Sequence, residues 1–357
     1  MARTARKDVY DKEEVGTYHC SSRVVRRAFL CGYDEYSQTD YNHRKHWIDD
    51  LLRFMACYFA IDQISHSIMS NHLHNQLRNR PDIARKLRDK TVAYNWLMLH
   101  PHKREKDGTP CEPTDEQIAE ITGNKKKLEL LRERLSDISW FMKYLKERIA
   151  RRANKEDEAR GHFFEARFTM TKLLDEPAAL VCSVYIDLNP VRAGAAATPE
   201  TSEHTSFYDR VQAYQDQKLH QRKKPPRQTI PADAYLSPLF TRKLPAELCY
   251  AEQKYRASDD AGLAISFEEY AQLVDWTGRQ LRSDKRGAIA AEEPPMLDRL
   301  HINSAAWVEA MSHFEDWFHN FVGGAEAMAK AALDKGQQWL QGIRRCRQLF
   351  GADEPSA

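Results

Sequence analysis

The chain has 357 residues and a formal net charge of +2, and its 42% apolar content is enough for a sizeable buried core. No apolar run is long enough to span a bilayer, and the charged N-terminus lacks the apolar segment of a signal peptide. The seven cysteines are scattered and form no C-x-x-C pair, which argues against zinc ribbons and redox dithiols and favours a cytoplasmic protein.

The first part of the chain predicts a strand, a helix and two further strands. Residues 17–25 (TYHCSSRVV) are rich in β-branched and aromatic side chains, and residues 41–59 carry apolar side chains at helical spacing. Residues 61–69 predict a second strand, and after a turn residues 72–80 predict a third. This order is typical of an α+β fold with an antiparallel sheet.

The middle of the chain predicts an insertion followed by helices and one more strand. Residues 100–125 are polar and marked by Pro and Gly, and they contain one short helical pattern. Residues 125–160 predict one bent helix or two helices, and residues 161–174 predict a loop and a short strand. The next helix, residues 175–189, begins at a capping Asp175 and ends before Pro190.

The rest of the chain predicts a linker and a helical region. Ser266 and Glu269 form a capping box, and Gly336 is a possible break in a later helix pair. Aromatic residues at helical spacing indicate core packing at Trp307, Phe314, Trp317 and Phe321. We therefore expect an N-terminal tail over 1–16, a first domain over 17–215, a basic linker over 216–235 and an all-helical domain over 236–357.

His72 and His74 are candidate metal ligands. On a strand, side chains two positions apart point to the same face, so both imidazoles could bind one divalent cation. The pattern alone is weak, and half-exposed polar surface is the ordinary alternative. Tyr185 and Asn189 lie one helical turn apart, so an amide oxygen suited to Mg²⁺ or Mn²⁺ would stand beside a phenol. A cation would favour the phenolate and polarise a phosphodiester, but core packing for Tyr185 and a helix end at Asn189 remain open.

Basic residues are clustered although the net charge is small. Local clusters can dominate phosphate binding, and four together favour a polyanionic partner over plain solvated surface. They are Arg23, Arg26 and Arg27; Arg148, Arg151, Arg152 and Lys155; residues 220–228 (HQRKKPPRQ); and Arg344, Arg345 and Arg347.

Four segments in this order resemble one known family: YHCSSRVVRRAF, MSNHLHNQLRNRPD, GHFFEARF and YIDLNPVRAG. Over about residues 17–205 the chain resembles the IS200-like transposases of the HUH superfamily, in the branch of REP-associated tyrosine transposases. The resemblance implies a ferredoxin-like or RRM-like antiparallel sheet with packed helices. It also implies cleavage of single-stranded DNA beside a hairpin, in a bacterial, nucleoid-associated monomer or homodimer.

The resemblance assigns roles to particular residues. Tyr185 would form a 5′-phosphotyrosine link and leave a free 3′-hydroxyl, and His72, His74 and Asn189 would hold Mg²⁺ or Mn²⁺. Candidate DNA contacts are Arg23, Arg26, Arg27, Arg78, Arg80, Arg167 and Arg192, with Tyr18, Phe163 and Phe164 as possible stacking partners.

Asn75 departs from the family pattern, because the position after the second histidine is commonly apolar. A buried Asn75 would need a hydrogen-bonding partner. Gln76 would share the face of the histidines and contact DNA or a metal-bound water.

Three functions remain open on the sequence. The chain could be a DNA strand transferase with a tyrosine nucleophile, a catalytically weak or domesticated hairpin-binding protein, or a nuclease in which water attacks. The complete set of expected catalytic residues favours the first.

Overall fold

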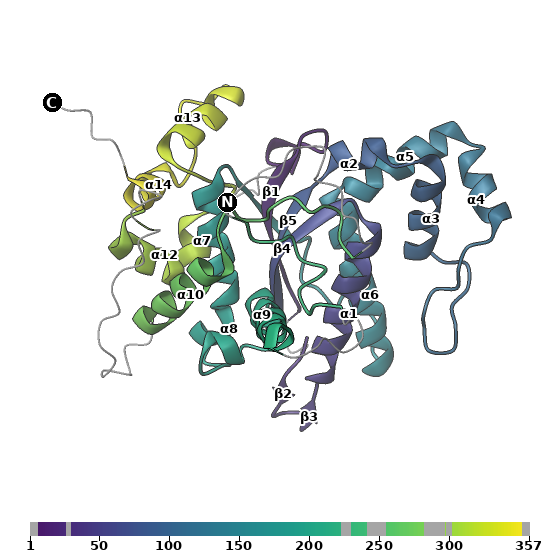
Figure 1. Cartoon of the computed structure of the whole chain (residues 1–357), viewed down its shortest axis with the longest axis horizontal. Coiled ribbons are helices and arrows are strands. Elements are labelled where there is room, and N and C mark those ends of the chain that lie inside the picture. Colours follow the sequence, from purple (N-terminus) through teal and green to yellow (C-terminus); the bar gives the residue numbers. More distant parts are fainter. Residues whose placement is uncertain are drawn as a thin grey trace.

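The computed structural model describes residues 6–25, 30–222, 230–240, 255–281, 297 and 302–351. Within them the chain forms an α+β fold with a five-stranded sheet in the order β4-β5-β1-β6-β7 and helices on both faces (Figure 1). A separate two-stranded hairpin, β2 (Tyr33–Asp34) and β3 (Thr39–Asp40), lies at one end of the molecule. The α+β class predicted from the pattern of elements is confirmed.

Four strands of the sheet follow the predicted segments closely, whereas the fifth lies in the region predicted to be all-helical. The strands of the sheet are β1 (Gly16–Arg23), β4 (Ile61–Ile68), β5 (His72–Asn79), β6 (Thr169–Leu173) and β7 (Phe321–Val322). The first four pair antiparallel, but β7 pairs parallel with β6. The expectation of a purely antiparallel sheet and of an all-helical C-terminal region is therefore wrong. The short buried pair Phe321 and Val322 completes the sheet edge beside β6.

One face of the sheet is covered by α1 (His43–Tyr58) and α6 (Ile138–Glu156) (Figure 1). Four further helices extend sideways from this layer: α2 (Pro81–Lys86), α3 (Asp89–Leu99), α4 (Asp115–Thr122) and α5 (Lys125–Ser136). The predicted insertion holds one short helix, α4, which begins at a capping box formed by Thr114 and Gln117.

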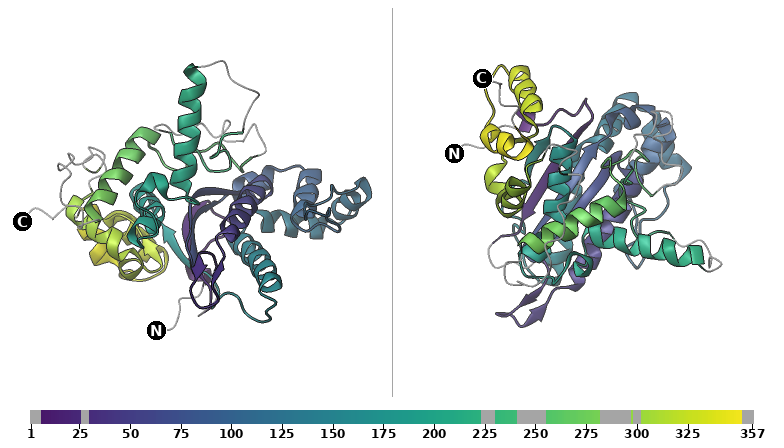
Figure 2. Two further views of the ribbon diagram at one scale, coloured as in Figure 1. Left: turned by 90° about the horizontal axis from the view of Figure 1, so that it is seen from below. Right: turned by 60° about the vertical axis from the view of Figure 1, so that its left-hand side comes forward.

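The opposite face carries α7 (Glu176–Asp187) and the C-terminal helices, which Figure 2 shows from two further directions. The remaining elements are η1 (Arg6–Asp8), α8 (Asn189–Arg192), η2 (Pro199–Thr201), α9 (Ser206–Arg222), α10 (Phe267–Leu281), α12 (Ser304–Trp317), α13 (Ala325–Asp334) and α14 (Ile343–Phe350). The predicted capping box opens α10, and Gly336 with φ +63° follows α13.

The apolar core is continuous from Val9 to Phe350 and includes residues on both sides of the predicted linker. Part of that linker, residues 223–229, lies outside the described residues, and its first residues belong to α9. Residues 230–240 run along the outer edge of β4, where the Ser237 amide donates to the Gln63 carbonyl at 2.7 Å. This segment covers a strand edge that would otherwise expose unpaired backbone groups.

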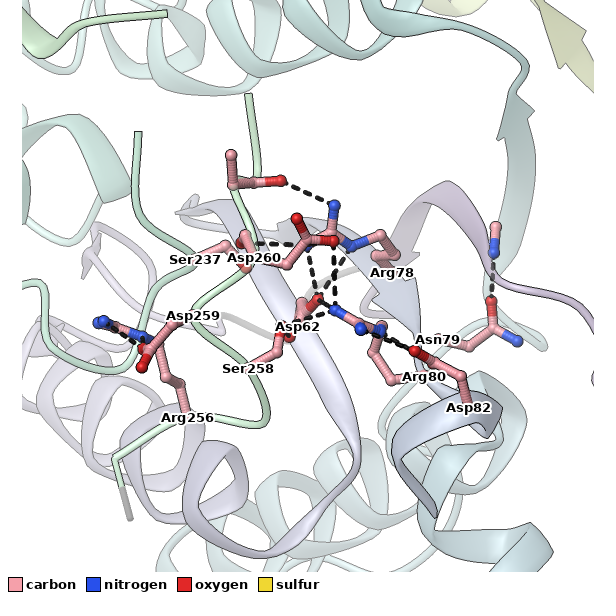
Figure 3. Close-up of polar contacts among 12 residues, drawn as sticks. Asp62, Arg78, Asn79, Arg80, Asp82, Ser237, Arg256, Ser258, Asp259 and Asp260 are labelled. Carbon is pink, nitrogen blue, oxygen red and sulfur yellow. Dashed lines mark hydrogen bonds and ion pairs between the residues drawn. The ribbon is translucent and has the colours of Figure 1, made fainter. Parts of the chain in front are cut away.

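Asp62 is the centre of a buried ion network that ties the loop at Ser258 and Asp260 to the sheet (Figure 3). Its carboxylate accepts hydrogen bonds from Arg78 at 2.7 and 2.9 Å and from Arg80 at 3.1 Å. Ser258 donates to the same carboxylate at 2.7 Å, so two arginines and a distant loop share one acceptor. None of the helices in the described ranges is long and apolar enough to cross a membrane.

Candidate active site

Helix α7 carries Tyr185 and is fixed at both ends. At its start Asp175 accepts the Ala178 amide at 3.0 Å, with Pro177 in the first turn, as the sequence predicts. At its end Asp187 accepts the Ser206 hydroxyl at 2.6 Å. Asp175 also accepts the Gly324 amide at 2.6 Å, so both ends of the helix are bound to neighbouring elements and hold Tyr185 in one position above the sheet.

His72 and His74 lie side by side on β5 with ring centroids 4.8 Å apart. His72 Nδ1 lies 2.6 Å from Oδ1 of Asn71, so Nδ1 carries the proton and Nε2 keeps its lone pair. His74 is 1% exposed, and its Nε2 has no hydrogen-bonding partner. Nε2 of His72 and Nε2 of His74 therefore lie close together on the sheet, and each carries either a lone pair or an unpaired proton.

His19 on β1 is a third imidazole that the sequence analysis did not single out. Its Nε2 lies 2.9 Å from His74 Nδ1, and the two rings stack with centroids 5.1 Å apart. The strand register places His19 opposite Gln76 and thus on the histidine face. Alternation along residues 17–23 could have assigned His19 to one face of its strand. The sequence does not show the pairing register of β1 and β5 that brings His19 to His74.

Burial disfavours the protonated form of all three imidazoles. Burial lowers the pKa of His19 to about 4, with His72 adding to the effect. Burial also lowers the pKa of His72 to about 4, assisted by Arg23 and Arg192, and lowers that of His74 well below its usual value. Neutral imidazole is the form that ligates a metal ion.

Tyr185 meets these histidines edge-on. Its ring centroid lies 5.6 Å from that of His74 and 6.1 Å from that of His19. Burial and the nearby Glu315 raise the pKa of Tyr185, while Arg192 and Asn189 act against the rise. The predicted tyrosine and histidine therefore come together across more than a hundred residues. Because this pKa is raised, the residues around the phenol do not by themselves favour the phenolate.

Asn189 opens α8 one helical turn beyond Tyr185 and is 6% exposed. Its side-chain Nδ2 has no partner. A rotation of the amide by about 180° exchanges its two polar atoms and leaves the oxygen unpaired instead. Asn189 can then act as an oxygen ligand, as the sequence predicts for the third member of the set.

The donor set fits a divalent cation. Nε2 of His74, which has no partner, Nε2 of His72 and the side-chain amide of Asn189 would supply a mixed N/O set of the kind that Mg²⁺, and still better Mn²⁺, accepts. Within the described ranges no three or more His, Cys, Asp or Glu side chains are arranged to hold a metal together. A cation here would therefore depend on Asn189.

The C-terminal region completes the site. Phe314 on α12 stacks on the Tyr185 ring, with centroids 4.4 Å apart and planes at 19°. Glu315, the next residue, places Oε1 3.9 Å from His74 Nδ1. Tyr185 is consequently only 4% exposed. The aromatic spacing of this helix predicted core packing, and the structure shows that part of this packing lies over the candidate nucleophile.

A pocket of about 820 Å³ opens beside the histidines. It lies between β1, β6, the loop before β6 and α12 with the segment that follows it. Its lining includes Arg6, His19, Arg23, His72, Arg167 and Glu315. The predicted basic residues Arg23 and Arg167 are both exposed at this pocket. His72 and Phe314 line this pocket, whereas Tyr185 lies behind Phe314.

The other predicted DNA contacts are distributed differently. Arg192 lies 4.9 Å over the Tyr185 ring and donates to the Ser312 carbonyl at 2.9 Å. Arg78 and Arg80 are bound to Asp62, and Arg78 stands six residues from His72, roughly 20 Å along the strand. These two arginines serve the ion network of Figure 3 and not the site. Arg26 and Arg27 lie outside the described residues.

The predicted stacking residues are part of the core. Tyr18 is 0% exposed and packs edge-on against Tyr10, while Phe163 and Phe164 are buried against each other. Rings in these positions have no free face for a nucleobase, so that expectation is wrong.

Asn75 and Gln76 are both buried, and their side chains lie among other residues of the protein. Asn75 is 1% exposed on the face opposite the histidines, and its Nδ2 has no partner, so the departure from the family pattern leaves a buried orphan donor. Gln76 accepts the Ser183 hydroxyl at 2.6 Å and donates to the Ala179 carbonyl at 3.1 Å. Its amide thus ties α7 to the sheet and is not directed at DNA.

Comparison of the chain with protein-family models, with curated proteins and with solved structures found no match. The assignment of a function therefore depends on the geometry of the site and on the sequence motifs.

Proposed function

We propose that this chain is a metal-dependent enzyme that cleaves and rejoins single-stranded DNA at hairpin-forming repeats, with Tyr185 as the nucleophile. One observation carries the proposal: the Tyr185 ring packs against His74, a buried imidazole whose Nε2 has no partner. A buried imidazole nitrogen without a partner costs folding free energy if its role is packing alone. Beside a phenol, the same nitrogen can bind a metal ion that activates the phenol as a nucleophile.

The order of elements supports this reading. A strand, a helix, two strands, further helices and a fourth strand form the antiparallel part of the sheet in the order β4-β5-β1-β6. This is the arrangement of a ferredoxin-like fold, which we propose for the core. In it the histidines lie on an inner strand, and the tyrosine helix packs across them.

The chemistry assigns separate tasks to the residues present. His72, His74 and Asn189 would hold Mg²⁺ or Mn²⁺, which when bound polarises the scissile phosphodiester and lowers the pKa of the phenol. Tyr185 Oη then forms a bond to phosphorus as the bond from phosphorus to the 3′-oxygen breaks. The phenol releases its proton and the 3′-oxygen takes one up, which leaves a 5′-phosphotyrosine and a 3′-hydroxyl. The reverse attack rejoins the strand, so no nucleotide cofactor is required.

Exposed arginines support a polyanionic substrate. Arg23 and Arg167 line the pocket that opens at His72. Their forked guanidinium groups suit backbone phosphates, and they would bring the strand to the site without reading its sequence.

A second candidate, a hairpin-binding protein with weak or no catalysis, is favoured by one specific observation. Tyr185 lies under Phe314, and the pKa of its phenol is raised by burial and Glu315. A protein that kept this arrangement on DNA would bind without forming a covalent link.

A labelled single-stranded hairpin oligonucleotide incubated with Mn²⁺ separates these functions. The enzyme should give a covalent adduct that survives denaturing electrophoresis and is absent in Tyr185→Phe. Tyr36→Phe is the matched control, because Tyr36 is 99% exposed between β2 and β3 and is not part of the candidate site. Binding without cleavage supports the second candidate. Cleavage that persists in Tyr185→Phe means that water is the nucleophile, and it contradicts the proposal.

A further inference from the structure

A small pocket lies on the opposite layer of the molecule, between α3, the loop that follows it and α6. It encloses about 220 Å³, less than the roughly 300–1,000 Å³ typical of drug-sized ligands. It has room for one small group and not for a nucleobase with its sugar. Its polar lining consists of His100, Arg104, Tyr144, Glu147, Arg148 and Arg151.

The three arginines of this pocket reach it from two elements. Arg148 and Arg151 stand on α6, where Arg148 lies 5.2 Å over the Tyr144 ring and Arg151 pairs with Glu147 at 2.7 Å. Arg104 comes from the loop and donates to the Gly108 carbonyl at 2.8 Å. Gly108 has φ +91°, which glycine adopts without strain, so a tight turn presents Arg104 to the helix.

The pocket carries an excess of positive charge. Three guanidinium groups face one carboxylate, and in the described ranges neither Arg104 nor Arg148 makes an ion pair with an acidic side chain. Burial lowers the pKa of His100, and Lys143, Arg134 and Arg104 lower it further against the opposing Glu147.

The positive surface continues beyond the pocket along α6. Trp140 is flanked by Arg134 at 4.1 Å and Lys143 at 4.3 Å from its ring centroid. Trp96 lies against His100 with the two rings tilted by 33° and their centroids 4.4 Å apart. These rings orient the cations instead of neutralising them, because a cation over an aromatic face keeps its charge.

We propose that the pocket between α3 and α6 binds a phosphate group. Arginine forks from two elements can hold a phosphate with paired hydrogen bonds, which is why arginine is favoured at such sites. The phosphate could come from free phosphate or from the backbone of a DNA strand. In the second case the inference rests on the proposed function, and the pocket is a contact for DNA that extends past the cleavage site.

The test uses the full chain with Arg104→Gln and Arg148→Gln combined. Arg85→Gln combined with Arg279→Gln is the matched control, since both are exposed arginines paired with acidic residues elsewhere. Binding of a labelled single-stranded oligonucleotide is measured with EDTA and in the Tyr185→Phe background, so that cleavage plays no part. Isothermal titration with inorganic phosphate is run in parallel without DNA.

If the pocket contacts the DNA backbone, the plot of log affinity against log salt should be less steep in the pocket variant. The magnitude of its slope should fall by about 1.4, because two contacts of about 0.7 each are lost. Free phosphate as the ligand predicts an unchanged DNA slope and a phosphate titration that the pocket variant abolishes. Either result supports the pocket. If both measurements match those of the control variant, the inference is overturned. Because neither measurement requires metal or cleavage, a failed nuclease assay leaves the test intact.

Discussion

His19 offers a test of how the candidate metal ligands are prepared. It shares one hydrogen bond with His74, and burial lowers the pKa of both rings. If the proton lies on His74 Nδ1 and is donated to His19, then His74 Nε2 has a free lone pair for a metal. The opposite tautomer places a proton on His74 Nε2 and blocks ligation. His19 should therefore act as a positioning residue for His74.

His19→Phe keeps a ring of similar shape for stacking but removes the acceptor. In the metal-bound state the His74 Nδ1 proton is then buried without a partner, which costs about 1–3 kcal/mol. This corresponds to a loss of about 5- to 160-fold in metal affinity, which includes the range of about 10- to 100-fold seen when such supporting contacts are removed. His19→Gln retains an acceptor near the position of Nε2 and should lose less.

The assay is a direct titration of Mn²⁺ by electron paramagnetic resonance or calorimetry on folded protein, without DNA. His102→Phe serves as the control, because His102 is exposed and away from the histidine cluster. Equal Mn²⁺ affinity in wild type, His19→Phe and His102→Phe would refute the positioning role. An equal loss in His19→Phe and His19→Gln would show that the ring matters and the hydrogen bond does not.

Three further predictions concern stability and cleavage. Burial would raise the pKa of Asp49, but hydrogen bonds from His204 and His66 hold it at about 2, below its usual 3.8. The resulting stability of about 2 kcal/mol is present above pH 4 and lost as the pH falls towards 2, and urea unfolding of Asp49→Asn should lack this pH dependence. Asp62→Asn removes the fully buried carboxylate that Arg78 and Arg80 share and should cost about 3–5 kcal/mol by chemical denaturation, whereas Asp82→Asn removes a more exposed partner of Arg80 and should cost less than about 1 kcal/mol; equal effects would contradict the central role of Asp62. His72→Ala should abolish cleavage at limiting metal but change DNA affinity by less than about threefold, because affinity depends on basic residues; unchanged cleavage would exclude His72 as a ligand.

The sequence predicted those parts of the site that depend on local pattern. Alternation on a strand placed His72 and His74 on one face, and helical spacing placed Tyr185 and Asn189 one turn apart. Caps at Asp175 predicted where the tyrosine helix begins. These features are set by residues within a few positions of each other, so periodicity is sufficient to find them.

The parts that were missed depend on contacts between distant segments. His19 reaches His74 only through the register of β1 and β5. Phe314 lies on Tyr185 because α12 packs on α7, which no local pattern encodes. Arg78 looked like a phosphate contact until strand pairing brought it opposite Asp62. An arginine in a motif can therefore be a structural ion pair, and only the tertiary structure distinguishes the two.

The most direct test of the central claim is mass spectrometry of the peptide that remains attached to DNA after cleavage in Mn²⁺. The proposed function predicts a single modified peptide in which Tyr185 carries a 5′-phosphate, together with a released strand that ends in a 3′-hydroxyl. Attachment at any other residue, or complete cleavage with no DNA-linked peptide, would contradict it.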